Sequence, residues 1–420
     1  MSGKGDVVAA VDFGSYAIRV LIGRRTPEGM FLITGYGQAL SKECVHFGAI
    51  QNIQAAAKAF RKALDAARAM AGERIVSVYC GIQGDTVKSN LFEGKVQVEN
   101  GLVKPEHLIQ ARKNAELGSV ASGSRSIGCI VSEEWLLDNM PVMNPLNMRG
   151  NVLTGRLRYT QLSAFLENNL RQCIENEGLT VADFVFTPLA AAYGCLLPED
   201  KKSGAAVVNL GATCSGIVVY QNGKVIEAGA YKWGCGDIIN DVASVLRISF
   251  AEATELVMDY GINLDLYADE NTPSSQASPS ANDVTIKLSH TVTGAPTTIK
   301  KSVLDEIVFL RANELTDQIC GTLNEKRLLY ALPRGLVITG GGANINNLDR
   351  IIYLKSGVET RIGTPLGFQE IPDAIDAPEW TAVTGILTYG FAHRQATGGA
   401  PETANSLWAA IWHFIKEYIA

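Results

Sequence analysis

The segment VVAAVDFGSYAIRVLIG, residues 7–23, decides the fold, because it reads as a strand, a tight turn and a second strand. Its apolar runs at 7–11 and 18–22 are typical of buried strands, and the Asp-Phe-Gly-Ser turn at 12–15 separates them. The same pattern returns at 205–220, where Asn-Leu-Gly stands in place of Asp-Phe-Gly. A repeat of this kind predicts two similar α/β halves that face each other.

A third glycine cluster, VITGGGA at 337–343, also follows a short apolar strand. Glycine has no Cβ and tolerates positive φ, so such a turn lets backbone N–H groups approach a phosphate closely. One turn of this kind is more often an ordinary tight turn, but two facing turns and a triple glycine favour a nucleotide cleft. The candidate cofactor-binding residues are Asp12, Gly14, Ser15, Tyr16, Asn209, Gly211, Ala212, Thr213, Gly340, Gly341, Gly342 and Ala343.

Composition excludes several classes of function. The net charge of -6 and the lack of a basic run argue against nucleic-acid binding. Eight cysteines without a C-x-x-C pair argue against a zinc ribbon or a disulfide framework. The histidines have no metal-ligand spacing and predict no metal site: His46, His107, His290, His393 and His413. With no signal peptide and no run of about 20 apolar residues, we expect a cytoplasmic chain that does not span a bilayer.

Further elements are expected along the chain. Residues 85–161 lie between the two halves and read as an inserted subdomain with its own strands and helix. Residues 269–281 are too polar and too rich in proline and serine to pack, and are expected to form a loop. The expected strands are 31–36, 87–92, 126–132 and 152–159, and the expected helices are 53–70, 106–117 and 303–325.

The last residues predict a helix that is separate from the body. Residues 394–405 are polar and rich in glycine and proline, which is typical of a flexible tether. Residues 407–419 would form a helix about 20 Å long, too short to cross a hydrocarbon core of roughly 30 Å. Tryptophan prefers the lipid interface, so we expect this helix to lie flat on a membrane, although a helix docked on the body is the alternative. Its apolar stripe consists of Leu407, Trp408, Ile411, Trp412, Ile415, Tyr418 and Ile419.

These features resemble the actin, Hsp70 and sugar-kinase superfold, and within it the FtsA family of bacterial actin-like cell-division proteins. The resemblance covers nearly the whole chain, including the insertion at 85–161 and the amphipathic tail. Residues 11–23 resemble the first phosphate segment of the family, and residues 187–196 its first connecting helix. Residues 233–261 resemble the start of the subdomain that encloses the adenosine, and residues 337–348 and 358–365 resemble the adenosine segment and the segment that follows it. Residues 379–390 resemble the second connecting helix.

The resemblance implies an α/β fold of the duplicated actin/Hsp70-like ATPase type, with two lobes around a nucleotide cleft, an FtsA-type inserted subdomain and a C-terminal amphipathic helix. The first lobe would comprise 1–84 and 162–197, separated by the insertion at 85–161, with 366–393 returning to it. The second lobe would comprise 198–235, a subdomain at 236–303, and 304–365. A linker at 394–405 and the membrane-targeting helix at 406–420 would follow.

The resemblance also implies a function. Such a chain would tether FtsZ to the cytoplasmic face of the inner membrane at the division site, as a peripheral protein. It would bind the FtsZ C-terminal tail and lipids, assemble into actin-like filaments, and contact other divisome proteins through the insertion. Two alternatives stay open: a pilus-assembly platform protein, which generally lacks such a tail, and a sugar-kinase-type enzyme. The enzyme would need a catalytic base near the γ-phosphate, and Asp12 is the only cleft acid that the sequence identifies, so no catalytic residue is predicted.

Several positions depart from the family pattern. The second phosphate segment of the family reads Asp-Ile-Gly-Gly-Gly-Thr-Thr-Asp, whereas residues 209–216 read Asn-Leu-Gly-Ala-Thr-Cys-Ser-Gly. Ala17 replaces a lysine, and Thr254 and Val257 replace a glutamate and a lysine expected over the adenosine. Each change removes a charge or the room for backbone approach. We therefore expect ATP with Mg²⁺ to bind weakly or not at all, without significant hydrolysis.

Overall fold

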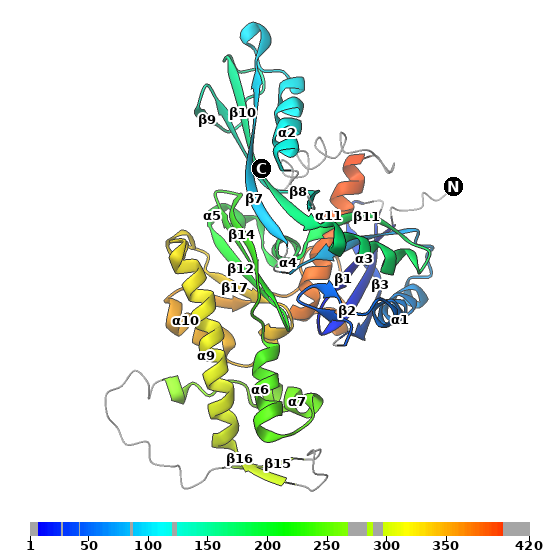
Figure 1. Cartoon of the computed structure of the whole chain (residues 1–420), viewed down its shortest axis with the longest axis vertical. Coiled ribbons are helices and arrows are strands. Elements are labelled where there is room, and N and C mark those ends of the chain that lie inside the picture. The colour runs from blue at the N-terminus through cyan, green and yellow to red at the C-terminus, as the bar shows by residue number, and fades with distance from the viewer. Residues whose placement is uncertain are drawn as a thin grey trace.

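The computed structural model describes residues 7–26, 28–41, 43–84, 87–119, 124–267, 284–288 and 297–397. The predicted loop at 269–281, residues 398–405 of the predicted linker and the whole membrane-binding stripe lie outside these residues. Residues 394–397, predicted to begin the linker, instead continue the last described helix. Two five-stranded sheets with helices around them form the two lobes, and a third sheet extends away from the first lobe (Figure 1).

The first lobe is built on a sheet with the strand order β11-β6-β1-β2-β3. β1 runs antiparallel to β2 and parallel to β6, so the hairpin turn after β1 lies at one edge of the cleft. Two helices, α1 and α3, pack on one face of the sheet, and α11 packs on the other. The bounds are β1 Val7–Phe13, β2 Ala17–Arg25, β3 Phe31–Leu40, β4 Val45–His46, β5 Ala49–Ile50, α1 Ile53–Ala71, β6 Ser77–Ile82, α3 Ala164–Glu175, β11 Thr180–Phe186, α4 Thr187–Cys195 and α11 Thr381–Thr397.

The second lobe repeats this arrangement in a sheet ordered β14-β13-β12-β17-β18. β12 is antiparallel to β13 and parallel to β17, as β1 is to β2 and β6. The predicted duplication is therefore confirmed. The bounds are α5 Pro198–Ser203, β12 Ala205–Leu210, β13 Ser215–Gln221, β14 Lys224–Tyr231, α6 Gly236–Leu246, α7 Phe250–Tyr260, β15 Thr285–Leu288, β16 Thr297–Lys300, α9 Lys301–Glu325, β17 Leu336–Thr339, α10 Leu348–Ser356 and β18 Thr360–Ile362.

The insertion between β6 and α3 forms its own four-stranded sheet, ordered β7-β10-β8-β9, with α2 packed on it (Figure 1). Its strands are longer than the sequence patterns predicted, because β7 and β8 continue to pair with β10 as far as Gln97 and Leu137. β7 and β8 also contact β14 at the edge of the second lobe. The bounds are β7 Lys88–Gln97, α2 Pro105–Ser119, β8 Ser124–Leu137, β9 Met140–Val142 and β10 Val152–Ser163.

The helices α4 and α11 cross at a contact made by two glycines. A Cβ added to Gly194 in α4 would overlap the Thr381 carbonyl oxygen of α11. In the same way, a Cβ added to Gly385 in α11 would overlap the Ala190 carbonyl oxygen of α4. Only glycine lets two helix backbones approach this closely, so the sequence at these positions sets the distance between the helices.

Candidate functional site

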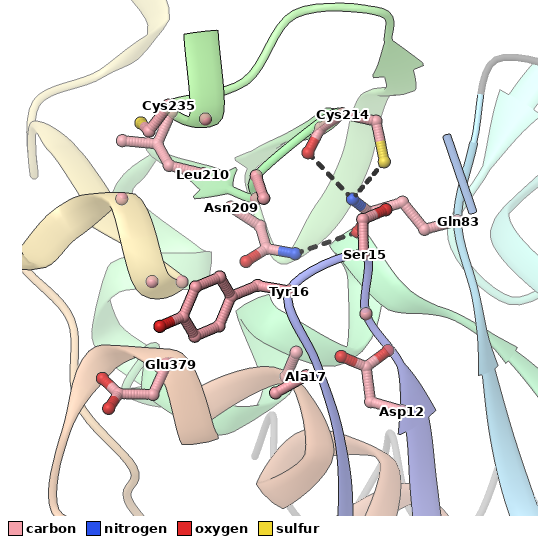
Figure 2. A pocket seen from close by; sticks show the side chains of 18 of the residues that line it. Asp12, Ser15, Tyr16, Ala17, Gln83, Asn209, Leu210, Cys214, Cys235 and Glu379 are labelled. Atoms are coloured by element: carbon pink, nitrogen blue, oxygen red, sulfur yellow. Dashed lines mark hydrogen bonds between the residues drawn. The ribbon is translucent and has the colours of Figure 1, made fainter. Parts of the chain in front are cut away.

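A cavity of about 460 Å³ lies between the lobes, where the β1–β2 turn, the β12–β13 turn and the triple glycine meet. Most of the predicted cofactor-binding residues line it, and Tyr16 extends into it from the first turn (Figure 2). The lining residues from that prediction are Asp12, Gly14, Ser15, Tyr16, Asn209, Gly211, Ala212, Gly340, Gly341 and Gly342. The fold thus brings three distant segments of the sequence to one site.

Two predicted residues do not line the cavity. Ala343 is 1% exposed and packs in the core of the second lobe. The Thr213 hydroxyl lies in the β12–β13 turn and donates to Ser15 Oγ at 2.7 Å. It also accepts a hydrogen bond from the Phe47 backbone N–H at 3.0 Å. Thr213 therefore joins the two lobes instead of facing into the cavity.

Gln83, which sequence reasoning missed, makes a second connection between the lobes (Figure 2). It follows β6 in the first lobe, and its Nε2 donates to the carbonyl oxygen and Sγ of Cys214 at 3.1 and 2.9 Å. Asn209 Nδ2 in turn donates to Gln83 Oε1 at 3.1 Å. We call these contacts, together with those of Thr213, the cleft bridge. A lone glutamine after a strand carries no sequence pattern that would have identified it.

The turn glycines are explained by the turns that they form. A Cβ on Gly14 would lie 2.7 Å from the Ala17 carbonyl oxygen, and one on Gly211 would overlap the Cys214 carbonyl oxygen in the same way. Gly340 has a φ of 82°, in the left-handed region that disfavours a side chain. Each glycine is thus required by the backbone, with or without a phosphate beside it.

The charged side chains that line the cavity come from both ends of the chain. Arg19 stands opposite Asp12 in the β1–β2 pair. Burial raises the pKa of Asp12, while the nearby Arg19 cation and a hydrogen bond from Thr187 at 3.5 Å act in the opposite direction. Burial lowers the pKa of Arg19, and the carboxylates of Glu379 and Asp12 oppose this shift. The Arg19 guanidinium also lies 5.6 Å from the centre of the Trp380 ring.

Glu379 corrects one prediction directly. The sequence placed Asp12 as the only acid of the cleft, but Glu379 also lines the cavity. It precedes α11, more than three hundred residues from Asp12, and accepts a hydrogen bond from Asn344 at 2.8 Å. Arg19 was missed as well, although it is two residues from Ala17 on the same strand face and lines the same cavity. It supplies a cation close to the position where the family pattern has lysine.

Two of the positions that depart from the family pattern, Val257 and Gly216, were expected to face a ligand but do not line the cavity. Val257 was expected to face a ligand, but it is 0% exposed within the core of the second lobe. Thr254, one helical turn earlier, does line the cavity, and its hydroxyl donates to the Phe250 carbonyl at 2.7 Å. Gly216 is not among the lining residues, and a Cβ there would overlap the Pro188 ring. An aspartate at 216 would therefore require a different path for α4.

Among the described residues, no group of three or more His, Cys, Asp and Glu side chains could hold a metal ion. None of the helices in that part of the chain is long and apolar enough to cross a membrane. The three described histidines have other contacts. His107 Nδ1 accepts from the Lys104 N–H at 3.0 Å, His393 Nδ1 lies 3.0 Å from Tyr79 Oη, and the His46 ring packs against the Phe47 ring.

Comparison with known proteins finds similarity to cell-division proteins. The family model described as cell division protein FtsA matches residues 206–385. The FtsA protein of Pseudomonas aeruginosa is 24% identical over 408 residues, which cover 97% of this chain and 94% of that protein. The FtsA protein of Escherichia coli K12 is 22% identical over 418 residues, which cover 98% of this chain and 96% of that protein.

Solved structures agree on the fold. The PilM–PilN type IV pilus biogenesis complex contains a chain that superposes with a TM-score of 0.64 at 13% identity, covering 91% of this chain and 98% of that one. MreB5 of Spiroplasma citri bound to ADP gives a TM-score of 0.55 at 11% identity, and the match covers 94% of this chain and 99% of that one. The actin-like ATPase fold predicted from the sequence is confirmed, and in the MreB5 structure this fold holds a nucleotide.

Proposed function

We propose that this chain is a cell-division protein of the FtsA family and that it acts as an adaptor without significant enzymatic activity. In this role it ties FtsZ filaments, held by their C-terminal tails, to the cytoplasmic face of the inner membrane at the division site. It contacts other divisome proteins through the insertion. The observation that carries the proposal is the similarity to FtsA proteins over more than nine-tenths of both chains.

The pilus-platform alternative has less support. Its solved relative is 13% identical, which bears on the fold alone, whereas the relatives by sequence are FtsA proteins along the full chain. The sugar-kinase alternative needs a carboxylate free to act as a base at a γ-phosphate. Asp12 stands beside Arg19 and accepts from Thr187, and the Thr213–Ser15 hydrogen bond closes the space between the two turns where a γ-phosphate would lie. We therefore assign no catalytic residue.

A pelleting assay tests the adaptor function. Full-length protein mixed with FtsZ and liposomes should carry FtsZ into the pellet. A variant that ends at residue 405 and FtsZ without its C-terminal tail are the two controls, and each should leave FtsZ in the supernatant. Pelleting of tail-less FtsZ to the same extent, or no pelleting of intact FtsZ, would refute the proposal.

We also expect the protein to form filaments on lipid. Lobes that stack head to tail make a heterologous contact, which propagates instead of closing. Tethering to a surface raises the local concentration and favours that contact. Electron microscopy on lipid monolayers should show rows of particles at high coverage. Isolated particles at the same coverage would contradict self-assembly.

Mg-ATP is expected to bind weakly. Asn209→Asp alone should change the affinity for Mg-ATP by less than about tenfold, or 1.4 kcal/mol. A carboxylate at 209 would favour Mg²⁺, but it would lose the donor that now binds Gln83. The Thr213–Ser15 contact would remain. Isothermal titration with Mg-ATP measures the effect, and Asn209→Asp combined with Thr213→Gly is the comparison variant. Micromolar binding to the unchanged protein would contradict this expectation.

A further inference from the structure

The end of the cavity between the two hairpin turns is filled by the protein itself. Ser15 and Thr213 approach to 2.7 Å between oxygens, which leaves no room for a phosphoryl group between them. Gln83 is held from both sides by Asn209 and Cys214. A phosphate chain would have to break these hydrogen bonds, each worth about 0.5–1.5 kcal/mol net.

The charges that line the cavity do not favour a polyanion. Two carboxylates, Asp12 and Glu379, face one guanidinium, Arg19, and the remaining lining residues are uncharged. Nucleotide sites in general place lysine, arginine or Mg²⁺ against the phosphates. Here the cation stands opposite Asp12 in the strand pair, so its charge offsets the carboxylate that would otherwise attract Mg²⁺.

Another part of the cavity lining has apolar side chains that suit a flat ring. Ile239, Phe250 and Met258 from α6 and α7 line it, and so do the backbones of Gly340–342. Apolar side chains and side-chain-free backbone together offer surfaces for an aromatic heterocycle. Burial of such a ring contributes roughly 25 cal/mol for each Å² removed from water.

Glu379 adds a specific polar contact. The Asn344 amide makes the only hydrogen bond that the described residues contribute to its carboxylate, through Oε2. The carboxylate can therefore accept further hydrogen bonds from hydroxyl groups of a ligand. Acidic side chains hold ribose hydroxyls in dinucleotide sites by this geometry.

We propose that the cavity binds an uncharged nucleoside, with its ring against the apolar side chains of α6 and α7 and its ribose hydroxyls on Glu379, in preference to any phosphorylated form. This assignment deepens the proposed function and rests on it, because an adaptor needs no phosphate transfer. Adding phosphates should weaken binding, because they meet the cleft bridge and two carboxylates and gain only one cation.

Isothermal titration of the full chain with adenosine, AMP and ATP, with and without Mg²⁺, tests the proposal. We expect adenosine to bind at least tenfold more tightly than ATP, with no gain from Mg²⁺. Equal or tighter binding of Mg-ATP overturns the proposal. Adenosine that fails to bind at about 1 mM, which corresponds to roughly -4 kcal/mol, overturns it as well.

The ribose contact has its own test. Glu379→Gln should weaken adenosine binding about fivefold or more, whereas Glu370→Gln, at an exposed position before α11, should not change it. On the unchanged protein, 2′,3′-dideoxyadenosine should bind as weakly as adenosine binds to Glu379→Gln, which keeps the test valid if the variant is unstable. Equal binding of adenosine and its dideoxy form by the unchanged protein refutes the contact.

The pelleting assay separates this inference from the adaptor function. If adenosine does not bind while FtsZ still pellets with liposomes, only the ligand assignment fails. If adenosine binds with the expected preference while FtsZ stays in the supernatant, the adaptor function fails and the ligand assignment stands.

Discussion

Gly385→Ala should destabilise the protein by about 2–4 kcal/mol, because the new Cβ would overlap the Ala190 carbonyl oxygen. That oxygen belongs to the backbone of α4 and cannot move away as a flexible side chain would. The two helices must then separate, and α11 is the helix that covers one face of the first-lobe sheet. Thermal or denaturant unfolding of the full chain measures the loss.

Gly321→Ala is the matched control for this change. Gly321 also lies inside a helix, α9, but nothing comes within 4 Å of a Cβ added there. Alanine favours the helix over glycine by up to about 1 kcal/mol, so this variant should be slightly more stable. The two identical substitutions should therefore shift the unfolding midpoint in opposite directions. A shift of the same sign at both positions would show that the α4–α11 contact tolerates a side chain.

Trp412→Glu should lower the affinity of the protein for liposomes at least tenfold. The prediction rests on the apolar stripe of the sequence, because residue 412 lies outside the described residues. Removing a large apolar side chain from its burial costs about 1.5–3 kcal/mol, and a buried charge adds to that cost. The tail has few charges, Lys416 against Glu417, so attraction to anionic lipids compensates little. Liposome co-sedimentation measures the bound fraction.

His413→Glu controls for the added charge. In the helix that the sequence predicts, position 413 would fall on the side opposite the stripe, so a glutamate there should stay in water. Its lipid binding should stay close to that of the unchanged protein. Because the proposed filaments would bind through many tails at once, both variants should be compared at a protein concentration too low for filaments to form. Unchanged binding of Trp412→Glu would mean that the tail is a helix docked on the body.

The sequence was a good guide where local patterns determine structure. Short apolar runs, a glycine turn and a second apolar run predicted the β1–β2 and β12–β13 hairpins, and both form as predicted. The sequence predicted a helix at 303–325, and α9 begins two residues earlier and ends at the predicted residue. These elements depend on hydrogen bonds and side-chain periodicity within a few residues, which the sequence carries directly.

Sequence reasoning failed where the direction of a side chain was inferred only from its position in a family pattern. Val257 was expected to face a ligand, but the helix turns it into the core. Thr213 was expected beside a phosphate, but its hydroxyl binds Ser15 of the other lobe. In both cases the position of the residue along the chain was known from the sequence. The direction of its side chain depends on tertiary packing, which cannot be inferred from that position alone.

By itself, the sequence determined the duplicated strand–turn–strand units, the inserted sheet and the amphipathic pattern of the tail. Only the tertiary structure decided what fills the cleft. Gln83, Arg19 and Glu379 come from three segments that meet because the two sheets and α11 converge on one cavity. A hydrogen bond or a charge pair depends on distances of a few Å, and folding alone brings residues hundreds of positions apart to such distances.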